Sequence, residues 1–215
     1  MNTFNQIKDE NRRAFIKGMS YYASLGLTFS TLLGGCKPIN EHSMVTPLNL
    51  TPAEWQHLHR CIELATEALE AGDEPFGSVL VAADGTVLAE DRNRVVSSGD
   101  RTRHPEFELA RWAAANMTAE ERAAATVFTS GEHCPMCAAA HGWVRLGRIV
   151  YVSSSDQLMT WLAELGVPPS PVRSLSIREI VPDLLVEGPI PDLAEQVREL
   201  HRRFHRSSRE ARPQI

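Results

Sequence analysis

Two short motifs in this chain contain residue types that bind metal ions. The first is His104-Pro105-Glu106, and the second, about thirty residues later, is Cys134-Pro135-Met136-Cys137. In each motif a proline follows the first residue, and proline is favoured at the first position of a helix. Imidazole and thiolate groups suit zinc, and three protein ligands leave the fourth tetrahedral position open for water. We therefore predict a catalytic zinc site at two helix N-termini, with His104, Cys134 and Cys137 as ligands.

Glu106 follows the predicted histidine ligand by two residues. Helix N-termini stabilise thiolates as anions, and zinc lowers the pKa of a bound water. Attack of that water on an aminated ring carbon also requires a proton for the ring nitrogen and then for the departing ammonia. Glu106 is placed to carry that proton. A lone Cys-x-x-Cys is equally typical of redox or structural zinc sites, but the two motifs in this order match the zinc deaminase pattern.

Composition and charge limit what the rest of the chain does. The 215 residues are 43% hydrophobic and 23% charged, which is enough to bury one sizeable core. The formal net charge of -5 argues against a basic nucleic-acid-binding body and favours small polar substrates. The four cysteines, Cys36, Cys61, Cys134 and Cys137, are not spread as a disulfide scaffold would be. Cys61 falls within a helical apolar pattern, which indicates a core thiol.

Periodicity and turn residues predict alternating helices and strands. Helices are expected over residues 52–71, 105–116, 135–146, 155–165 and 191–206, and strands over 77–82, 86–90, 125–129, 148–153 and 176–180. Asp84-Gly85 joins the first two strands as a tight turn. Such alternation predicts a largely parallel sheet with helices on both faces.

Residues 52 to about 152 resemble the cytidine and deoxycytidylate deaminase superfamily, most closely its guanine deaminase and tRNA adenosine deaminase branch. The matching segments occur in the family's order: Glu74–Val81, Asn93–Val95, Thr102–Glu106 and Cys134–Ala138. Two residues depart from the family pattern. His133 stands where proline is usual before the first cysteine, and Pro105 replaces a common alanine.

The resemblance implies a fold and a substrate pocket. It implies a three-layer α/β/α cytidine deaminase-like fold, whose five-stranded mixed sheet has parallel fourth and fifth strands, and it implies a homodimer. Within the pocket, Asn93 would hydrogen-bond the substrate, and Phe76 would line the pocket or stack on the ring. From the residues alone, Asn93 is equally a turn residue at a strand end. His133 is a substrate contact, a fourth ligand or a loop residue.

The expected activity is zinc-dependent hydrolytic deamination of an aminated nucleobase, nucleoside or related heterocycle, guanine- or cytosine-like, with release of ammonia. Two alternatives remain open. One is a tRNA adenosine-to-inosine deaminase, which needs a basic path for RNA. The basic residues between Arg198 and Arg209 are interleaved with glutamates, which is typical of a solvated helix face, so nucleic acid is not the expected partner. The other is a non-catalytic zinc-stabilised binding module, which has no need of Glu106.

The first 35 residues have the order of an export signal. Arg12-Arg13 resembles a twin-arginine motif, an apolar stretch follows, and Leu33-Gly34-Gly35-Cys36 resembles a lipoprotein box with Cys36 as the lipidated residue. This predicts a periplasmic or membrane-anchored protein; the alternative is a cytoplasmic protein that starts at Met44. The predicted divisions are signal 1–35, linker 36–50, cytidine deaminase-like catalytic domain 51–206 and flexible tail 207–215.

Overall fold

The computed structural model describes residues 49–210. The predicted signal, the lipidation residue Cys36 and almost all of the linker lie outside these residues. Among the helices of the described part, none is long and apolar enough to cross a membrane.

The described residues form helices and strands that alternate along much of the chain. In chain order they are α2 (Pro52–Glu70), β1 (Gly77–Val81), β2 (Val87–Arg92), α3 (Val95–Ser98), α4 (Pro105–Asn116), α5 (Ala119–Ala124), β3 (Thr126–Gly131), α6 (Pro135–Val144), β4 (Arg148–Ser153), α7 (Ser155–Glu164), α8 (Ile177–Ile180), β5 (Val186–Glu187) and α9 (Pro191–Glu210).

The strands form one sheet in the order β2-β1-β3-β4-β5. Strand β1 is antiparallel to both β2 and β3, whereas β3, β4 and β5 run parallel to one another. The mixed sheet with parallel fourth and fifth strands is thus confirmed. The expectation of a largely parallel sheet was wrong, because both neighbours of β1 run antiparallel to it. Alternation of helices and strands does not determine which strands become neighbours, and β3 pairs with β1 rather than with β2.

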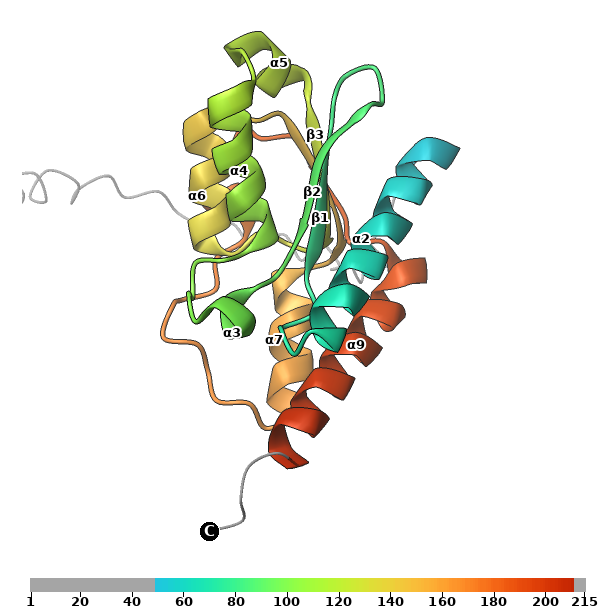
Figure 1. Cartoon of the computed structure of the whole chain (residues 1–215), viewed down its shortest axis with the longest axis vertical. Coiled ribbons are helices and arrows are strands. Elements are labelled where there is room, and N and C mark those ends of the chain that lie inside the picture. The colour runs from blue at the N-terminus through green and yellow to red at the C-terminus, as the bar shows by residue number, and fades with distance from the viewer. Residues whose placement is uncertain (1–48, 211–215) are drawn as a thin grey trace, which may run out of the picture. The chain divides into compact units, whose positions relative to one another are not determined.

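Helices cover both faces of the sheet. On β1, Val79 and Val81 pack in one apolar cluster with α2 and α9, whereas Leu80 packs in a second cluster with α4 and α6. Successive residues of a strand point to opposite faces, so one strand serves both clusters. Figure 1 shows α2 and α9 on one side of the sheet and α4 and α6 on the other. The three-layer α/β/α fold is confirmed.

The strand predicted over residues 176–180 is a short helix instead, α8, and the fifth strand is β5. Ser176 and Glu179 decide the outcome, because the Ser176 backbone N–H and hydroxyl both donate to Glu179 Oε2 at 2.9 Å. This capping box begins a helix, and its Ser-x-x-Glu signature was present in the sequence.

Two further helices were not predicted, and one runs longer than predicted. Helix α5 begins with another capping box, formed by Thr118 and Glu121, whereas α3 has no side-chain cap of its own at Arg94. Helix α9 extends to Glu210, past the predicted end at residue 206, so the predicted tail begins inside this helix.

Gly77 marks the closest approach of β1 to α2. A Cβ atom added there would lie 2.4 Å from Leu64 Cβ and 2.5 Å from the Cys61 carbonyl oxygen. The Cys61 carbonyl oxygen belongs to the backbone and cannot move without shifting α2. We therefore expect Gly77→Ala to lower the free energy of unfolding by about 1–3 kcal/mol or more. Urea denaturation of both proteins measures this change. An unchanged midpoint would contradict the packing of α2 on β1.

Candidate metal and active site

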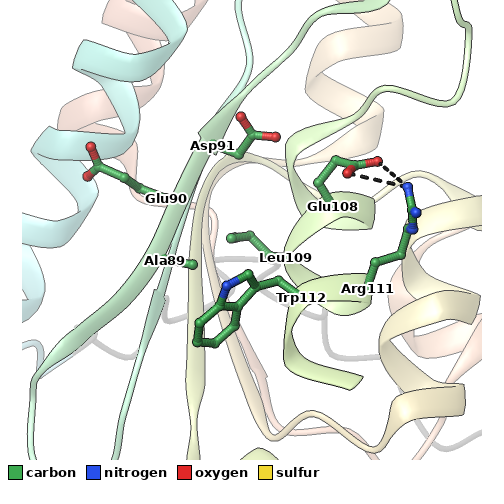
Figure 2. Close-up of a pocket in the computed structure, with 7 residues that line it drawn as sticks. All are labelled: Ala89, Glu90, Asp91, Glu108, Leu109, Arg111 and Trp112. Carbon is green, nitrogen blue, oxygen red and sulfur yellow. Dashed lines mark hydrogen bonds and ion pairs between the residues drawn. The ribbon is translucent and has the colours of Figure 1, made fainter. Parts of the chain in front are cut away.

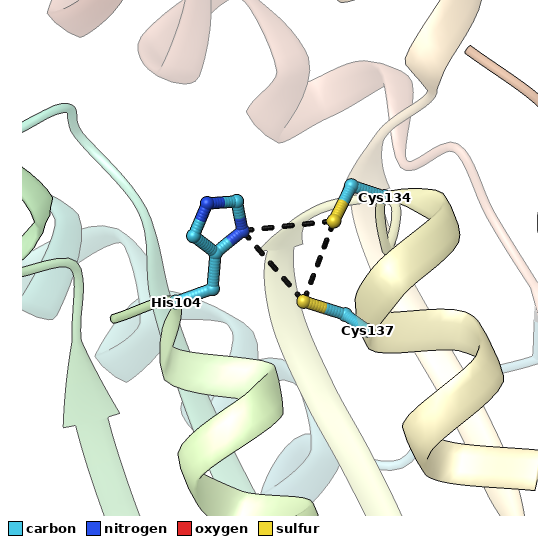
Figure 3. Close-up of side chains that lie close together, drawn as sticks. All are labelled: His104, Cys134 and Cys137. Carbon is cyan, nitrogen blue, oxygen red and sulfur yellow. Dashed lines mark hydrogen bonds between the residues drawn. The ribbon is translucent and has the colours of Figure 1, made fainter. Parts of the chain in front are cut away.

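Three side chains from two helix N-termini form one group of metal donors. The two sulfur atoms of Cys134 and Cys137 lie 3.5 Å apart, and each lies 3.6 Å from His104 Nδ1. Figure 3 shows the three side chains pointing toward one another. Zinc bonds of about 2.3 Å to sulfur and about 2.0 Å to nitrogen place tetrahedral ligand atoms roughly 3.5–3.8 Å apart. The donor set and its spacing therefore fit zinc, as the sequence predicted.

Local helix signals position these donors. His104 is the N-cap of α4 and Cys134 is the N-cap of α6, and neither side chain caps its own helix. Proline follows each as the first helical residue, and Cys137 lies in the first turn of α6. Both helices therefore direct unpaired N–H groups and positive dipole ends toward the donors.

The donors shift one another's protonation. A hydrogen bond with Cys137 is the main cause that lowers the pKa of Cys134 to about 4. Burial alone would lower the pKa of His104, but its hydrogen bond with Cys134 and nearby negative charges raise it to about 9. The hydrogen bond between Cys137 and Cys134, together with burial, raises the pKa of Cys137 well above its usual value. The cluster therefore holds protons that a metal ion would displace on binding.

Glu106 lies beside the metal donors, on the first turn of α4, and is 5% exposed. Its Oε1 accepts hydrogen bonds from Thr129 Oγ1 at 3.0 Å and from Ser78 Oγ at 3.3 Å. Ser78 Oγ also lies 2.9 Å from Thr129 Oγ1, so its single proton is donated either to that oxygen or to Glu106. Burial raises the pKa of Glu106, and the charge of His104 opposes that shift. One carboxylate oxygen of Glu106 is thus held by β1 and β3.

The structure places Asn93 and Phe76 next to each other. The Asn93 backbone N–H donates to the Phe76 carbonyl at 2.9 Å. Asn93 is fully buried, and its Nδ2 has no hydrogen-bond partner among the described residues. The Phe76 ring contacts His201 of α9 edge-on, with centroids 4.9 Å apart, and lies close to Gly131 at the end of β3. Their predicted role as substrate contacts stays a prediction.

His133 is buried in the loop between β3 and α6, and it is not part of the metal-donor group found in residues 49–210. Its ring packs edge-on against His141, with centroids 5.4 Å apart. Both ring nitrogens are buried without a hydrogen-bond partner in this part of the chain, and burial lowers the pKa of His133 well below its usual value. The structure therefore does not bring His133 into the donor group as a fourth ligand. Its role as a substrate contact stays a prediction.

Several residues around the site were not predicted from the sequence. Ser78 and Thr129 hold Glu106, although nothing in their local sequence indicates it. Glu132 accepts from the backbone N–H groups of Ser155 and Ile177, so it joins the first turns of α7 and α8. Glu74 lies within electrostatic reach of His104, and burial raises its pKa. The sequence indicated Glu74 only through its position directly before Pro75-Phe76-Gly77, within a segment that resembles the family.

A cavity of about 350 Å³ lies elsewhere, between β2 and α4. Figure 2 shows its lining, which includes Glu90, Asp91 and Glu108 but none of the three metal donors. All three carboxylates are engaged in ion pairs, with Arg60, Arg94, and both Arg103 and Arg111 respectively. This open, charge-paired cavity is separate from the metal cluster.

The fold and site together define a class: a three-layer α/β/α protein with a His-Cys-Cys metal cluster at two helix N-termini and a buried glutamate beside it. Residues 53–153 match the family model of the cytidine and deoxycytidylate deaminase zinc-binding region. The part of the chain that contains the metal donors is therefore similar to the zinc-binding region of this family.

Individual relatives agree with this similarity. The chain is 38% identical over 97 residues to guanine deaminase of Bacillus subtilis, which covers 45% of this chain and 62% of the relative. It is 38% identical over 94 residues to a tRNA-specific adenosine deaminase of Agrobacterium fabrum, covering 42% and 61%. The chain thus spans less than two thirds of either relative. The solved guanine deaminase of Nitrosomonas europaea shares the fold, with a TM-score of 0.56, 20% identity, and coverage of 84% and 100%.

Proposed function

We propose that this protein is a zinc-dependent hydrolytic deaminase of a small aminated heterocycle, either a guanine- or cytosine-like base or its nucleoside. The observation that carries the proposal is a buried glutamate held by two hydroxyls directly beside a three-donor metal cluster. A purely structural metal site has a closed ligand set and no need of such a carboxylate.

The chemistry divides between the metal and the protein. Zinc held by His104, Cys134 and Cys137 would lower the pKa of a water molecule to about 7 and so supply hydroxide. Glu106 takes the proton that the attacking water gives up and delivers it to the ring nitrogen next to the aminated carbon. Glu106 then moves the proton of the hydroxyl now bonded to the ring carbon to the exocyclic nitrogen, so that the C–N bond breaks, ammonia leaves and the ring carbon keeps a carbonyl oxygen.

Charge supports a small ring over an RNA substrate. The net charge is -5. On α9, Arg198 pairs with Glu164 at 2.8 Å and with Glu195 at 3.4 Å, and Arg202 pairs with Glu199. Arginines engaged in this way offer little free positive charge to a phosphate backbone.

The test is ammonia release by the zinc-loaded chain across guanine, cytosine, adenine, their nucleosides, aminopterins and aminotriazines. Turnover of one ring identifies the reaction and the substrate together. Turnover of a tRNA anticodon arm alone would establish the tRNA adenosine deaminase instead. Zinc binding without turnover of any amine would point to the non-catalytic module.

We also propose a homodimer. Its support is the family resemblance and the large exposed apolar side chain of Trp143 on α6, which is 88% exposed. Light scattering at micromolar concentration distinguishes the dimer from the monomer, and a monomeric mass throughout rejects the proposal.

Export and lipidation at Cys36 are a separate proposal that rests on Arg12-Arg13 and on Leu33-Gly34-Gly35-Cys36. Mass spectrometry of the N-terminus in a bacterial host, compared with Cys36→Ser, tests it. An intact, unlipidated N-terminus in both proteins contradicts it and favours a cytoplasmic protein.

A further inference from the structure

We propose that Asp73 is a positioning residue that holds α3 and thereby sets the orientation of the Asn93 side chain toward the substrate. This inference rests on the proposed deaminase function. Asp73 has no place in either metal-binding motif.

Asp73 is fixed at the end of a rigid helix. Its backbone N–H donates to the Ala68 carbonyl at 2.9 Å, directly after Gly72, whose φ of +83° ends α2 in the left-handed region. The Asp73 side chain is completely buried. A buried carboxylate is costly unless its oxygens accept hydrogen bonds, so the partners of Asp73 matter.

Those partners belong to one segment, residues 92–97. Asp73 Oδ1 accepts from the backbone N–H groups of Val96 and Ser97, both at 2.8 Å. Its Oδ2 accepts from Ser97 Oγ at 2.7 Å and from Arg92 Nη1 at 3.2 Å. Burial alone would raise the pKa of Asp73, but the bonds from Ser97, Val96 and Arg92 lower it. The carboxylate thus caps α3 from outside.

Helix α3 needs such a cap. A helix of only four residues is unstable by itself, and the N-cap residue Arg94 provides no side-chain hydrogen bond. Asn93 and Asp73 satisfy its first N–H groups instead, because Asn93 Oδ1 accepts from Val95 N–H at 2.9 Å. The two side chains therefore cap the same helix end together.

This arrangement determines which end of the Asn93 amide is available. Because Oδ1 must be the acceptor for Val95 N–H, the buried and unpartnered group is the Nδ2 donor. Asn93 thus offers hydrogen-bond donors, which fit an acceptor atom of the substrate. Arg92 strengthens the link, since its Nη1 bonds both Asp73 Oδ2 and the Asn93 carbonyl, the latter at 3.1 Å. If α3 is released, the Asn93 amide loses its fixed orientation.

The same segment leads to the metal site. Arg94 N–H donates to the Arg103 carbonyl at 3.1 Å, immediately before the ligand His104. Asp73 therefore connects the rigid end of α2 to Asn93 through α3 and Arg92, and to the loop before His104 through one further hydrogen bond.

A double-mutant cycle on the full chain tests the inference. We expect Asp73→Asn to lower kcat/KM for the preferred ring by roughly 10- to 100-fold, mostly through KM, with zinc content unchanged. Asn93→Ala should cause a similar loss. Because Asp73 acts through Asn93, the double variant should be no worse than Asn93→Ala alone, to within about twofold.

Two variants separate positioning from loss of stability. Glu54→Gln removes a capping carboxylate at the other end of α2, together with its pair to Arg148, so it should lower the Tm while leaving KM unchanged. Ser97→Ala, at an exposed position, removes one bond to Asp73 and should give a smaller loss that is again absent in the Asn93→Ala background. This variant decides the matter if Asp73→Asn does not fold.

The two proposals fail in different ways. If the wild-type chain deaminates a ring but the losses of Asp73→Asn and Asn93→Ala multiply, the positioning role is wrong and the deaminase function stands. An equal rise of KM in Glu54→Gln would also overturn the positioning role. A wild-type chain that turns over no substrate overturns the proposed function, and this inference with it.

Discussion

Replacing Glu106 with glutamine should lower kcat by about 10²–10⁴-fold while the protein keeps its zinc. Glutamine has nearly the same shape and still accepts the hydrogen bonds from Ser78 and Thr129 through its amide oxygen. It cannot take up a proton and pass it on. Structure and metal binding should therefore survive, and only the proton transfers should fail.

The measurement is kcat beside zinc content by metal analysis on the same preparation. Glu108→Gln is the matched control, because Glu108 lies on the same helix and its carboxylate pairs with Arg103 and Arg111 rather than with a metal donor. It should keep near wild-type turnover. A fully active Glu106→Gln protein would falsify the proton-shuttle mechanism.

Replacing Cys137 with serine should remove both the zinc and the activity, and it should destabilise the fold. Cys137 is completely buried in the first turn of α6, so no other side chain can take its place without moving the helix. Apparent zinc-binding free energies reach about 10–16 kcal/mol in small zinc domains, and binding of this kind contributes directly to folding. Here the large core of the sheet supplies much of the stability, so a fall in Tm is expected rather than complete unfolding.

Chelator titration makes this prediction specific. A strong chelator should lower the Tm of the wild-type protein and leave the Tm of Cys137→Ser unchanged, because the variant has no zinc to lose. Cys61→Ala is the control, since Cys61 is an equally buried thiol within the α2 core and no part of the donor group. It should lose some stability and keep its zinc. Retention of zinc by Cys137→Ser, or its loss from Cys61→Ala, would contradict the assigned ligand set.

The sequence by itself determined the metal donors and the helices that present them. His104-Pro105 and Cys134-Pro135 each combine a ligand with an N1 proline, and the position of a helix start depends on the few residues around it. Local hydrophobic periodicity likewise located α2, α4, α6 and α9, because each helix buries one face of its own sequence.

Only the tertiary structure decided which residues surround the metal donors and hold Glu106 beside them. Ser78 and Thr129 reach Glu106 from two different strands, and β1 pairs with β3 across the chain, so no window of sequence contains both partners. The contacts of Asp73 with residues 92–97 and of Phe76 with His201 also join residues that are far apart in the sequence.

The segment 176–180, wrongly predicted as a strand, is a different case, because its sequence contains a local helix signal in the capping box of Ser176 and Glu179. A strand would also need a neighbour to pair with, and the position beside β4 is taken by β5. Local signals therefore specify where helices begin and which side chains are able to bind a metal. Which elements become neighbours depends on long-range packing and pairing, whose partners are brought together only when the chain folds.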